Sequence, residues 1–415
     1  MMRSLYSGVA GLNAHQTRMD VIGHNISNVN TVGYKKDRAT FQEMLSQMVR
    51  GPAGPTGERG GINPMQIGLG VQVGSIDTNH QQGSLEATGQ NTDLAIDGNG
   101  FFILRDGEEN FYTRAGNLSM DSEGYLVNSG NGLRMQGWRA DRATGTINTD
   151  QNISDIRIPI GDVMGAQPSS YIDFTGNLNS DGEIGVIHQT SVSIYDEFGA
   201  RHELILEFEK TANNEWNLTL SNDGSFDIEG GTDIPLVFEE GRLSTVDGGD
   251  DLLSNIELNN FANGANDIEE LELRLGEITQ FSGEYSAEAN NLDGNRMGSL
   301  QSFTIDDNGI VIGTYTNGVT RNLGQVAVAN FNNPDGLIKT GDTMYSQSVN
   351  SGISQVGQPG TGGRGEMRTA VLEMSNVDLA EEFSSMIVTQ RGYQVNSRII
   401  STVDQMLQEL ANMAR

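Results

Sequence analysis

The chain has 415 residues, which is long enough for two or three domains with hydrophobic cores. Its formal net charge is −30 at pH 7, and residues 146–290 hold 29 acidic side chains against 5 basic ones, so this middle segment would repel the phosphate backbone of a nucleic acid. The absence of cysteine excludes disulfides, thiolate metal sites and thiol nucleophiles.

The first thirty residues repeat apolar side chains at intervals of seven. Leu5, Leu12, Met19 and Ile26 form one row, and Ile22 lies alongside it. This spacing predicts a helix that presents an apolar seam to another helix. The segment lacks the apolar run of about 7 to 15 residues of a secretory signal peptide, so we expect no cleaved signal. No stretch approaches the roughly 18 apolar residues of a membrane span, so we expect no membrane insertion.

The string NISNVNTVGY, residues 25–34, is where this helix is expected to end. Asn25, Asn28 and Asn30 compete with the helix for backbone hydrogen bonds, and Thr31 is β-branched. Gly33 suits the left-handed conformation that caps a helix. A helix stop is a sufficient account of these residues taken alone.

Residues 36–69 are predicted to be a connector, because they contain the string GPAGPTGERGG at 51–61. Glycine recurs at every third position, as in collagen, but a triple helix needs many consecutive triplets and the chain has only 8 prolines. The prolines prevent a helix from continuing and the glycines let the chain turn. The connector residues are Gly51, Pro52, Gly54, Pro55, Gly57 and Gly60.

Residues 70–365 have the pattern of short β-strands. The segments 94–127, 191–220 and 303–331 alternate apolar runs with turn-forming pairs such as Asp-Gly and Asn-Gly. Such turns require left-handed backbone, which accounts for much of the glycine content of 53 residues.

From residue 370 onward the chain contains no proline and repeats the seven-residue row, which predicts a long helix. Its members are Leu372, Leu379, Met386, Tyr393, Ile400 and Leu407. This helix would pair most simply with the N-terminal helix, or with the same helices of neighbouring subunits. The alternative is an ordinary pair of amphipathic core helices.

The predicted fold class is therefore multidomain α+β, with long, coiled-coil-like, paired terminal helices and nested, mainly β, middle and outer domains. The inner helical domain comprises residues 1–35 and 366–415, followed by the connector at 36–69. The middle β domain is discontinuous, at 70–145 and 291–365, and the acidic outer β domain occupies 146–290.

The sequence offers no catalytic or metal-binding constellation. The five histidines show no HExxH spacing, and neither a GxSxG nor a P-loop string occurs. Adjacent carboxylates such as Asp196 and Glu197 point to opposite faces of a strand, so they cannot act together as general acid and base. We expect no enzyme activity, no cofactor and no metal site.

Three segments, in this order, resemble the axial proteins of the bacterial flagellum. Residues 4–38 are similar to the N-terminal signature shared by rod and hook subunits, which includes Asn25, Asn28, Asn30, Thr31, Gly33 and Tyr34. The string TDLAIDGNGFFIL at 92–104 resembles their common β motif, and residues 375–410 resemble their C-terminal helix. Residues 293–337 and the acidic insertion are most similar to the hook type.

The resemblance implies a structural subunit that self-assembles into a hollow, flexible, curved tube, a universal joint that passes torque from rod to filament. Both rows of helical seam residues would be buried between subunits. The implied partners are further copies of the chain, the distal rod protein, the hook cap or scaffolding protein, the hook–filament junction protein and the flagellar type III export apparatus. The implied location is the basal body and hook of the flagellum, outside the cell, reached without a cleaved signal peptide.

Two alternatives stay open at this stage. One is a distal rod protein of the same family, and the acidic insertion argues against it. The other is a secreted, acidic, β-rich adhesin or glycan-binding protein, which would bind a ligand through residues 146–290 and would not self-assemble.

Overall fold

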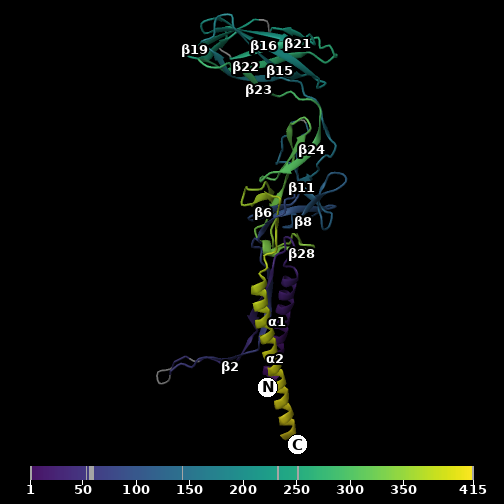
Figure 1. The fold of residues 1–415 in the computed structure, drawn as a ribbon. Helices are drawn as coiled ribbons and strands as arrows, with labels where there is room; N and C mark the ends of the chain where they lie inside the picture. The colour runs from purple at the N-terminus through teal and green to yellow at the C-terminus, as the bar shows by residue number, and fades with distance from the viewer. Residues whose placement is uncertain are drawn as a thin grey trace. The chain divides into compact units, whose positions relative to one another are not determined.

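The computed structural model describes residues 2–52, 54–55, 60–142, 144–230, 233–249 and 252–413 (Figure 1). The chain divides into two compact units. The first contains residues 1–158, 304–312 and 322–415, and the second contains residues 159–303 and 313–321. The described part of the first unit carries a long helix near each end, α1 (Met2–Ser27) and α2 (Leu379–Met413), and strands fill most of the chain between them. This confirms two terminal helices and a mainly β middle.

Helix α2 begins later than its seven-residue row suggested. Asp378 caps it, because its Oδ1 accepts the backbone N–H of Ala380 at 2.8 Å. Leu372 lies upstream of this cap in strand β32 (Val371–Glu373), which pairs with β5 (Leu85–Ala87). The prediction that Leu372 belongs to the helical row was wrong. The seven-residue interval between apolar residues does not show at which residue a polar cap begins the helix.

Helix α1 ends at Ser27, earlier than Gly33, so Gly33 is not its cap. Gly33 does adopt the left-handed conformation, with φ of 68°. Its N–H donates to the backbone oxygen of Glu373 at 2.8 Å, and an added Cβ would lie 2.5 Å from the nitrogen of Ala115. Glycine is required here by close backbone approach as well as by φ.

The predicted connector contains strands. Strand β1 (Asp37–Glu43) pairs with β4 (Val71–Thr78), and β2 (Ser46–Arg50) pairs with β3 (Met65–Gly68), so the chain leaves and returns as an antiparallel ribbon. The described residues of the glycine- and proline-rich string lie in the loop between β2 and β3. Among the predicted connector residues, Gly51, Pro52, Gly54, Pro55 and Gly60 are exposed in that loop, and Gly57 lies outside the described residues.

The rest of the first unit is built on an antiparallel sheet. Its central run follows the order β11-β7-β8-β29-β28. Phe101, Tyr112, Trp138, Phe331 and Tyr345 lie in a core against this sheet. Its strands in this unit are β7 (Phe101–Asp106), β8 (Glu109–Thr113), β9 (Leu118–Met120), β10 (Leu126–Asn128), β11 (Arg134–Arg139), β12 (Ser154–Asp155), β27 (Val328–Asn330), β28 (Ile338–Gly341), β29 (Met344–Ser346) and β30 (Gln355–Gly357), with the 3-10 helix η1 (Pro334–Gly336). Strands β6 (Leu94–Asp97) and β31 (Glu366–Thr369) pair in a two-stranded sheet of their own.

The second unit is a separate β body around a large apolar core that includes Phe174, Phe208 and Trp216. Its sheet follows the order β15-β16-β17-β19-β20-β22-β14-β23. The strands are β13 (Val163–Met164), β14 (Tyr171–Asn179), β15 (Ile187–Tyr195), β16 (Arg201–Ala212), β17 (Glu215–Asn222), β18 (Asp227–Glu229), β19 (Ile234–Glu239), β20 (Arg242–Val246), β21 (Leu253–Asn259), β22 (Ile268–Phe281) and β23 (Glu288–Leu292). The chain passes between the units in the region of β24 (Gly298–Ile305), β25 (Ile310–Tyr315) and β26 (Thr320–Val326).

One type of turn recurs in the first unit. In residues 121–125 the Oδ1 of Asp121 accepts the backbone N–H of Glu123 and of Tyr125, and Asp306 does the same for the N–H groups two and four residues later. The glycine at the fourth position has φ of 85° in one turn and 74° in the other. These are the turns that the Gly-rich pattern predicted, and they depend on local chemistry alone.

Candidate subunit interface

The two terminal helices pack side by side in antiparallel order (Figure 1). A Cβ added to Gly8 would lie 3.3 Å from a side-chain carbon of Ile400, and one added to Gly11 would lie 2.8 Å from Nδ2 of Asn396. Glycines at these positions therefore let the two backbones approach closely.

The seam between the helices uses small and polar residues. Asn25 and Glu382 are buried at one end of it, and burial raises the pKa of the Glu382 carboxyl, an effect that Asn25 opposes by hydrogen bonding. Thr389 and Val403 are buried further along α2. Residues 382, 389, 396 and 403 are seven apart, so the packing within one chain has the predicted interval but a different set of residues.

The predicted seam residues mostly flank this inner seam. Of that set, Ile22 is buried, whereas Leu379, Tyr393 and Leu407 are 41%, 41% and 37% exposed. The remaining helical members are half-buried, namely Leu5, Leu12, Met19, Ile26, Met386 and Ile400. Each α2 member lies three residues before or four after a position of the inner seam, which places this row along one edge of it.

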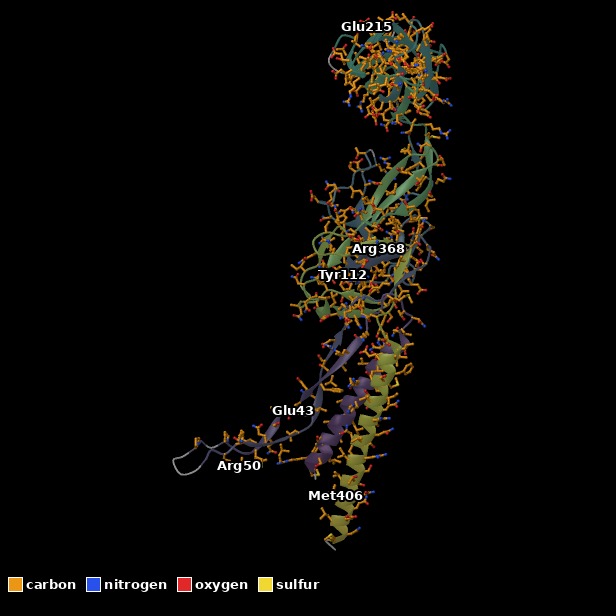
Figure 2. The ribbon with its side chains drawn as sticks, turned by 60° about the vertical axis from the view of Figure 1, so that its left-hand side comes forward. Glu43, Arg50, Tyr112, Glu215, Arg368 and Met406 are labelled. Carbon is orange, nitrogen blue, oxygen red and sulfur yellow. The ribbon has the colours of Figure 1, made fainter. Side chains whose placement is uncertain are left out.

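A second apolar row, which the sequence reasoning missed, follows the other edge of the α2 seam. Val388, Val395 and Met406 are 62%, 57% and 41% exposed (Figure 2 labels Met406). The interval of seven between Val388 and Val395 was the available signal. The described part of α2 therefore carries apolar side chains on both sides of the surface that it presents to α1.

The asparagine-rich motif builds the join between α1 and β1. Asn25 is 1% exposed. Its Nδ2 donates to the backbone oxygen of Asp37 at 2.8 Å, and its Oδ1 accepts the N–H of Asp37 and the hydroxyl of Tyr34. Thr31 donates to Oδ1 of Asn28 at 3.1 Å, while Asn30 is exposed. The motif fixes the path of the chain after the helix.

A buried ion cluster ties the start of the β region to the segment before α2. The side chains of Lys35 and Glu373 are fully buried and form an ion pair at 2.5 Å, and Arg114, at 3% exposed, lies 3.3 Å from the second Glu373 oxygen. The N–H of Gly83 also donates to Glu373. Burial lowers the pKa of the Lys35 ammonium, and the Glu373 carboxylate opposes that shift.

Neither a metal site nor a membrane span is evident in the described ranges. Across them, no group of three or more His, Asp or Glu side chains is arranged to hold a metal ion, and no helix is long and apolar enough to cross a membrane.

Comparison with known proteins decides the family. Four flagellar family descriptions match in chain order: "Flagella basal body rod protein" at 5–35, "Flagellar hook protein FlgE/F/G D1 domain" at 95–164, "Flagellar basal body protein FlaE D2 domain" at 166–295 and "Flagellar basal body rod FlgEFG protein C-terminal" at 368–413. The chain is 45% identical to the flagellar hook protein FlgE of Borreliella burgdorferi, over all of both chains. It belongs to the flagellar hook protein family.

Further comparisons agree with this assignment. The hook protein FlgE of Treponema pallidum is 39% identical, again over all of both chains. A crystal structure of Helicobacter pylori flagellar hook protein FlgE2 has the same fold, with a TM-score of 0.52 at 14% identity, and the match covers 70% of this chain and 100% of that one. The chain is thus a structural protein of the flagellar hook and basal body, as the three sequence segments predicted.

Proposed function

We propose that this chain polymerises into a hollow, curved, flexible tube, the hook, which acts as a universal joint that passes torque from the rod to the filament. Its family and its full-length identity to two hook proteins favour this over the distal-rod and adhesin alternatives. The observation that carries the proposal is the pair of apolar rows along α2, because members such as Tyr393, Leu407 and Val395 are 41%, 37% and 57% exposed in the single chain.

Neighbouring copies would cover both rows, so that the terminal helices form an inner wall with coiled-coil-like packing. Burying apolar surface contributes roughly 25 cal/mol per Å², so two rows of apolar side chains would contribute a favourable lengthwise contact. The second unit, with its excess of acidic side chains, would meet its neighbours through wet and weakly adhesive contacts, since a surface ion pair contributes about 0 to 1 kcal/mol. The inner wall of helices would then supply stiffness, and the outer domains would supply compliance.

In this proposal the inner domain comprises residues 1–35 and 366–415, the connector residues 36–69, the middle domain 70–145 with 291–365, and the outer domain 146–290. The chain would contact the distal rod protein, the hook cap, the hook–filament junction protein and the type III export apparatus. It would act outside the cell after export without a cleaved signal peptide.

The first test is assembly. The purified chain is concentrated and examined by negative-stain electron microscopy, and we expect hollow curved tubes. A compact monomer that persists at high concentration would overturn the proposal.

The second test places a charge in one apolar row. Tyr393→Asp should abolish tube formation, because a carboxylate would be buried against a neighbouring copy, while the β units stay folded. Gln394→Asp is the matched control, since it adds the same charge at the next residue, away from both rows. Equal loss of tubes in the two variants would mean that the row is not an interface.

A further inference from the structure

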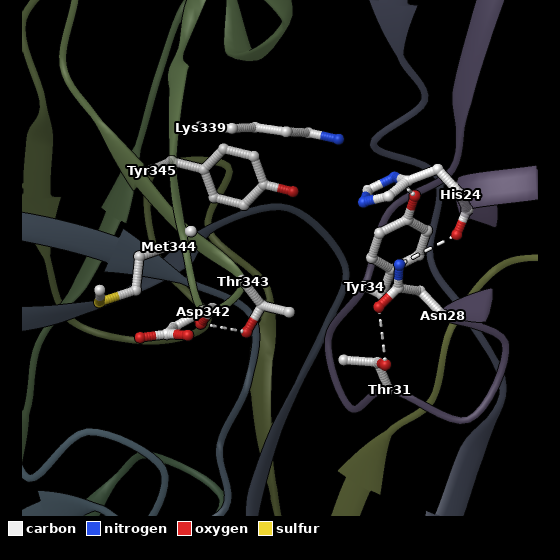
Figure 3. A pocket seen from close by; sticks show the side chains of 10 residues that line it. His24, Asn28, Thr31, Tyr34, Lys339, Asp342, Thr343, Met344 and Tyr345 are labelled. Carbon is white, nitrogen blue, oxygen red and sulfur yellow. Dashed lines mark hydrogen bonds between the residues drawn. The ribbon is translucent and has the colours of Figure 1, made fainter. Parts of the chain in front are cut away.

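A cavity of about 420 Å³ lies between the end of α1 and the β28–β29 hairpin (Figure 3). One wall comes from the asparagine-rich motif and the other from the hairpin. Its size is within the range of pockets that hold small ligands or a few side chains, about 300 to 1,000 Å³. The lining residues are His24, Asn28, Thr31, Tyr34, Lys339, Gly341, Asp342, Thr343, Met344 and Tyr345.

Several polar groups that line this cavity have partners in the same chain, and the exposed side chain of Asp342 adds a carboxylate to the lining. The hydroxyl of Tyr34 is within 3.0 Å of both Asn25 Oδ1 and His24 Nδ1. The ammonium of Lys339 is 2.6 Å from Asp37 and lies 5.5 Å from the centre of the Tyr34 ring. The walls offer an occupant tyrosine rings and threonine methyl groups beside the Asp342 carboxylate, which favours an apolar occupant without negative charge. The sulfur of Met344 is directed away from this space and accepts a hydrogen bond from Nδ2 of Asn131 at 3.1 Å.

The hairpin at the cavity holds an unfavourable backbone. Asp342 and Thr343 have φ of 49° and 56°, and a β-branched residue rarely adopts this conformation. The hydroxyl of Thr113 holds the turn by donating to the Thr343 carbonyl at 2.9 Å. Strain that the surrounding structure maintains in this way is typical of binding surfaces.

A turn at residues 346–355 presents exposed apolar side chains. It contains no charged side chain, and Val349 and Ile353 are 106% and 80% exposed. Ser351 is fully buried beneath them and exchanges hydrogen bonds with Ser348, and Asn333 donates to the carbonyl of Asn350 at 3.0 Å. A turn held this firmly presents its apolar side chains with little further loss of conformational entropy.

We propose that the Val349–Ile353 turn of one copy of this chain docks into the cavity of a second copy. The turn carries no charged side chain, so it is not repelled by the Asp342 carboxylate, whereas an acidic surface would meet that anion beside a Lys339 ammonium already paired with Asp37. Turn and cavity are different surfaces of one chain, so the contact is heterologous and can propagate into a helical polymer. This inference rests on the proposed assembly and names one contact within it.

The absence of native cysteine makes a direct test possible. Val349→Cys and Thr343→Cys are prepared as separate proteins with different affinity tags, mixed in equal amounts, polymerised and oxidised. A disulfide that joins the two differently tagged proteins can form only between copies, and only where the Cβ atoms of the two cysteines approach to about 4 Å. We expect mixed-tag dimers from polymers and none from dilute monomer. Polymers that yield no mixed-tag dimer would overturn the proposal.

Substitution gives an independent readout. Val349 is fully exposed in its own chain, so Val349→Asp should leave the monomer folded and raise the protein concentration needed for polymerisation about tenfold or more, the equivalent of one buried aliphatic side chain. Gln347→Asp in the same turn is the charge-matched control and should change the protein concentration needed for polymerisation little. If the wild type fails to polymerise, the proposed function fails; if it polymerises and Val349→Asp does so at the same concentration, only this contact fails.

Discussion

Among the described residues, Glu373 is the carboxylate that forms ion pairs with two buried cations, Lys35 and Arg114. Glu373→Gln keeps the shape of the side chain but leaves both cations without a counter-charge. We expect the free energy of unfolding of the first unit to fall by about 3 to 5 kcal/mol, as is typical when one partner of a buried pair is removed.

The two tryptophans allow the units to be followed separately, because Trp138 lies in the first unit and Trp216 in the second. Urea unfolding of Glu373→Gln in a Trp216→Phe background, monitored by Trp138 fluorescence, measures the change. Glu366→Gln, at an exposed position of β31, serves as the control. Equal midpoints for both variants would mean that the cluster contributes no stability.

His80 makes the stability of the first unit depend on pH. It packs between the rings of Phe101 and Tyr345, and burial, reinforced by Lys35, Arg114 and Lys339, lowers its pKa to about 4. The unfolded chain takes up a proton below pH 6.5, whereas the folded chain does so only near pH 4. Stability should therefore decrease as the pH falls through this window, by about 3 kcal/mol in total at 1.36 kcal/mol per pKa unit.

The same Trp138 unfolding curve, recorded between pH 7 and pH 4, measures this loss. His80→Asn should flatten the dependence in that window, while His188→Asn, in the second unit, should not. A wild-type curve that is level between pH 6.5 and 4 would contradict the assignment.

At the scale of elements, glycines decide how closely α1 and α2 approach. Gly11→Leu would drive a side chain into Asn396, whereas a Cβ at Gly23 meets nothing within 4 Å. We expect Gly11→Leu to lower the melting temperature of the helical circular-dichroism signal. Gly23→Ala should raise helix stability by about 0.5 to 1 kcal/mol, since it only removes the entropic disadvantage of glycine. A higher melting temperature for both variants would show that the close approach of α1 to α2 is not required.

The element scale also shows where sequence reasoning reached its limit. The seven-residue interval correctly predicted two helices, because periodicity is a property of each helix alone. It selected the large residues Leu12 and Tyr393, while the inner seam uses Gly11 and Asn396. Small residues carry no hydrophobic signal, so their role emerges only when the opposite helix is in place.

At the scale of the whole molecule, charge should oppose assembly. Residues 146–290 hold 29 acidic and 5 basic side chains, so neighbouring copies repel one another. Raising the ionic strength from about 0.1 M to about 1 M shortens the Debye length from about 10 Å to about 3 Å, and we expect polymerisation at lower protein concentration.

Sedimentation of polymers at several salt concentrations measures this effect. A variant with glutamine at the exposed positions Glu203, Glu209 and Glu215 should polymerise more readily at low salt and depend less on salt. Polymerisation that weakens as salt rises would show that attractive ion pairs dominate instead.

Periodicity, turn chemistry and motifs can be recognised in the amino-acid sequence, and they were enough to predict the helical ends, the mainly β middle, the Gly-dependent turns and the family. Folding of the chain in three dimensions is what brings Lys35 to Glu373, returns the connector as a paired ribbon, and places Thr31 and Thr343 around one cavity. Those contacts join residues up to 338 positions apart. They follow from how the chain folds back on itself, which no local pattern encodes.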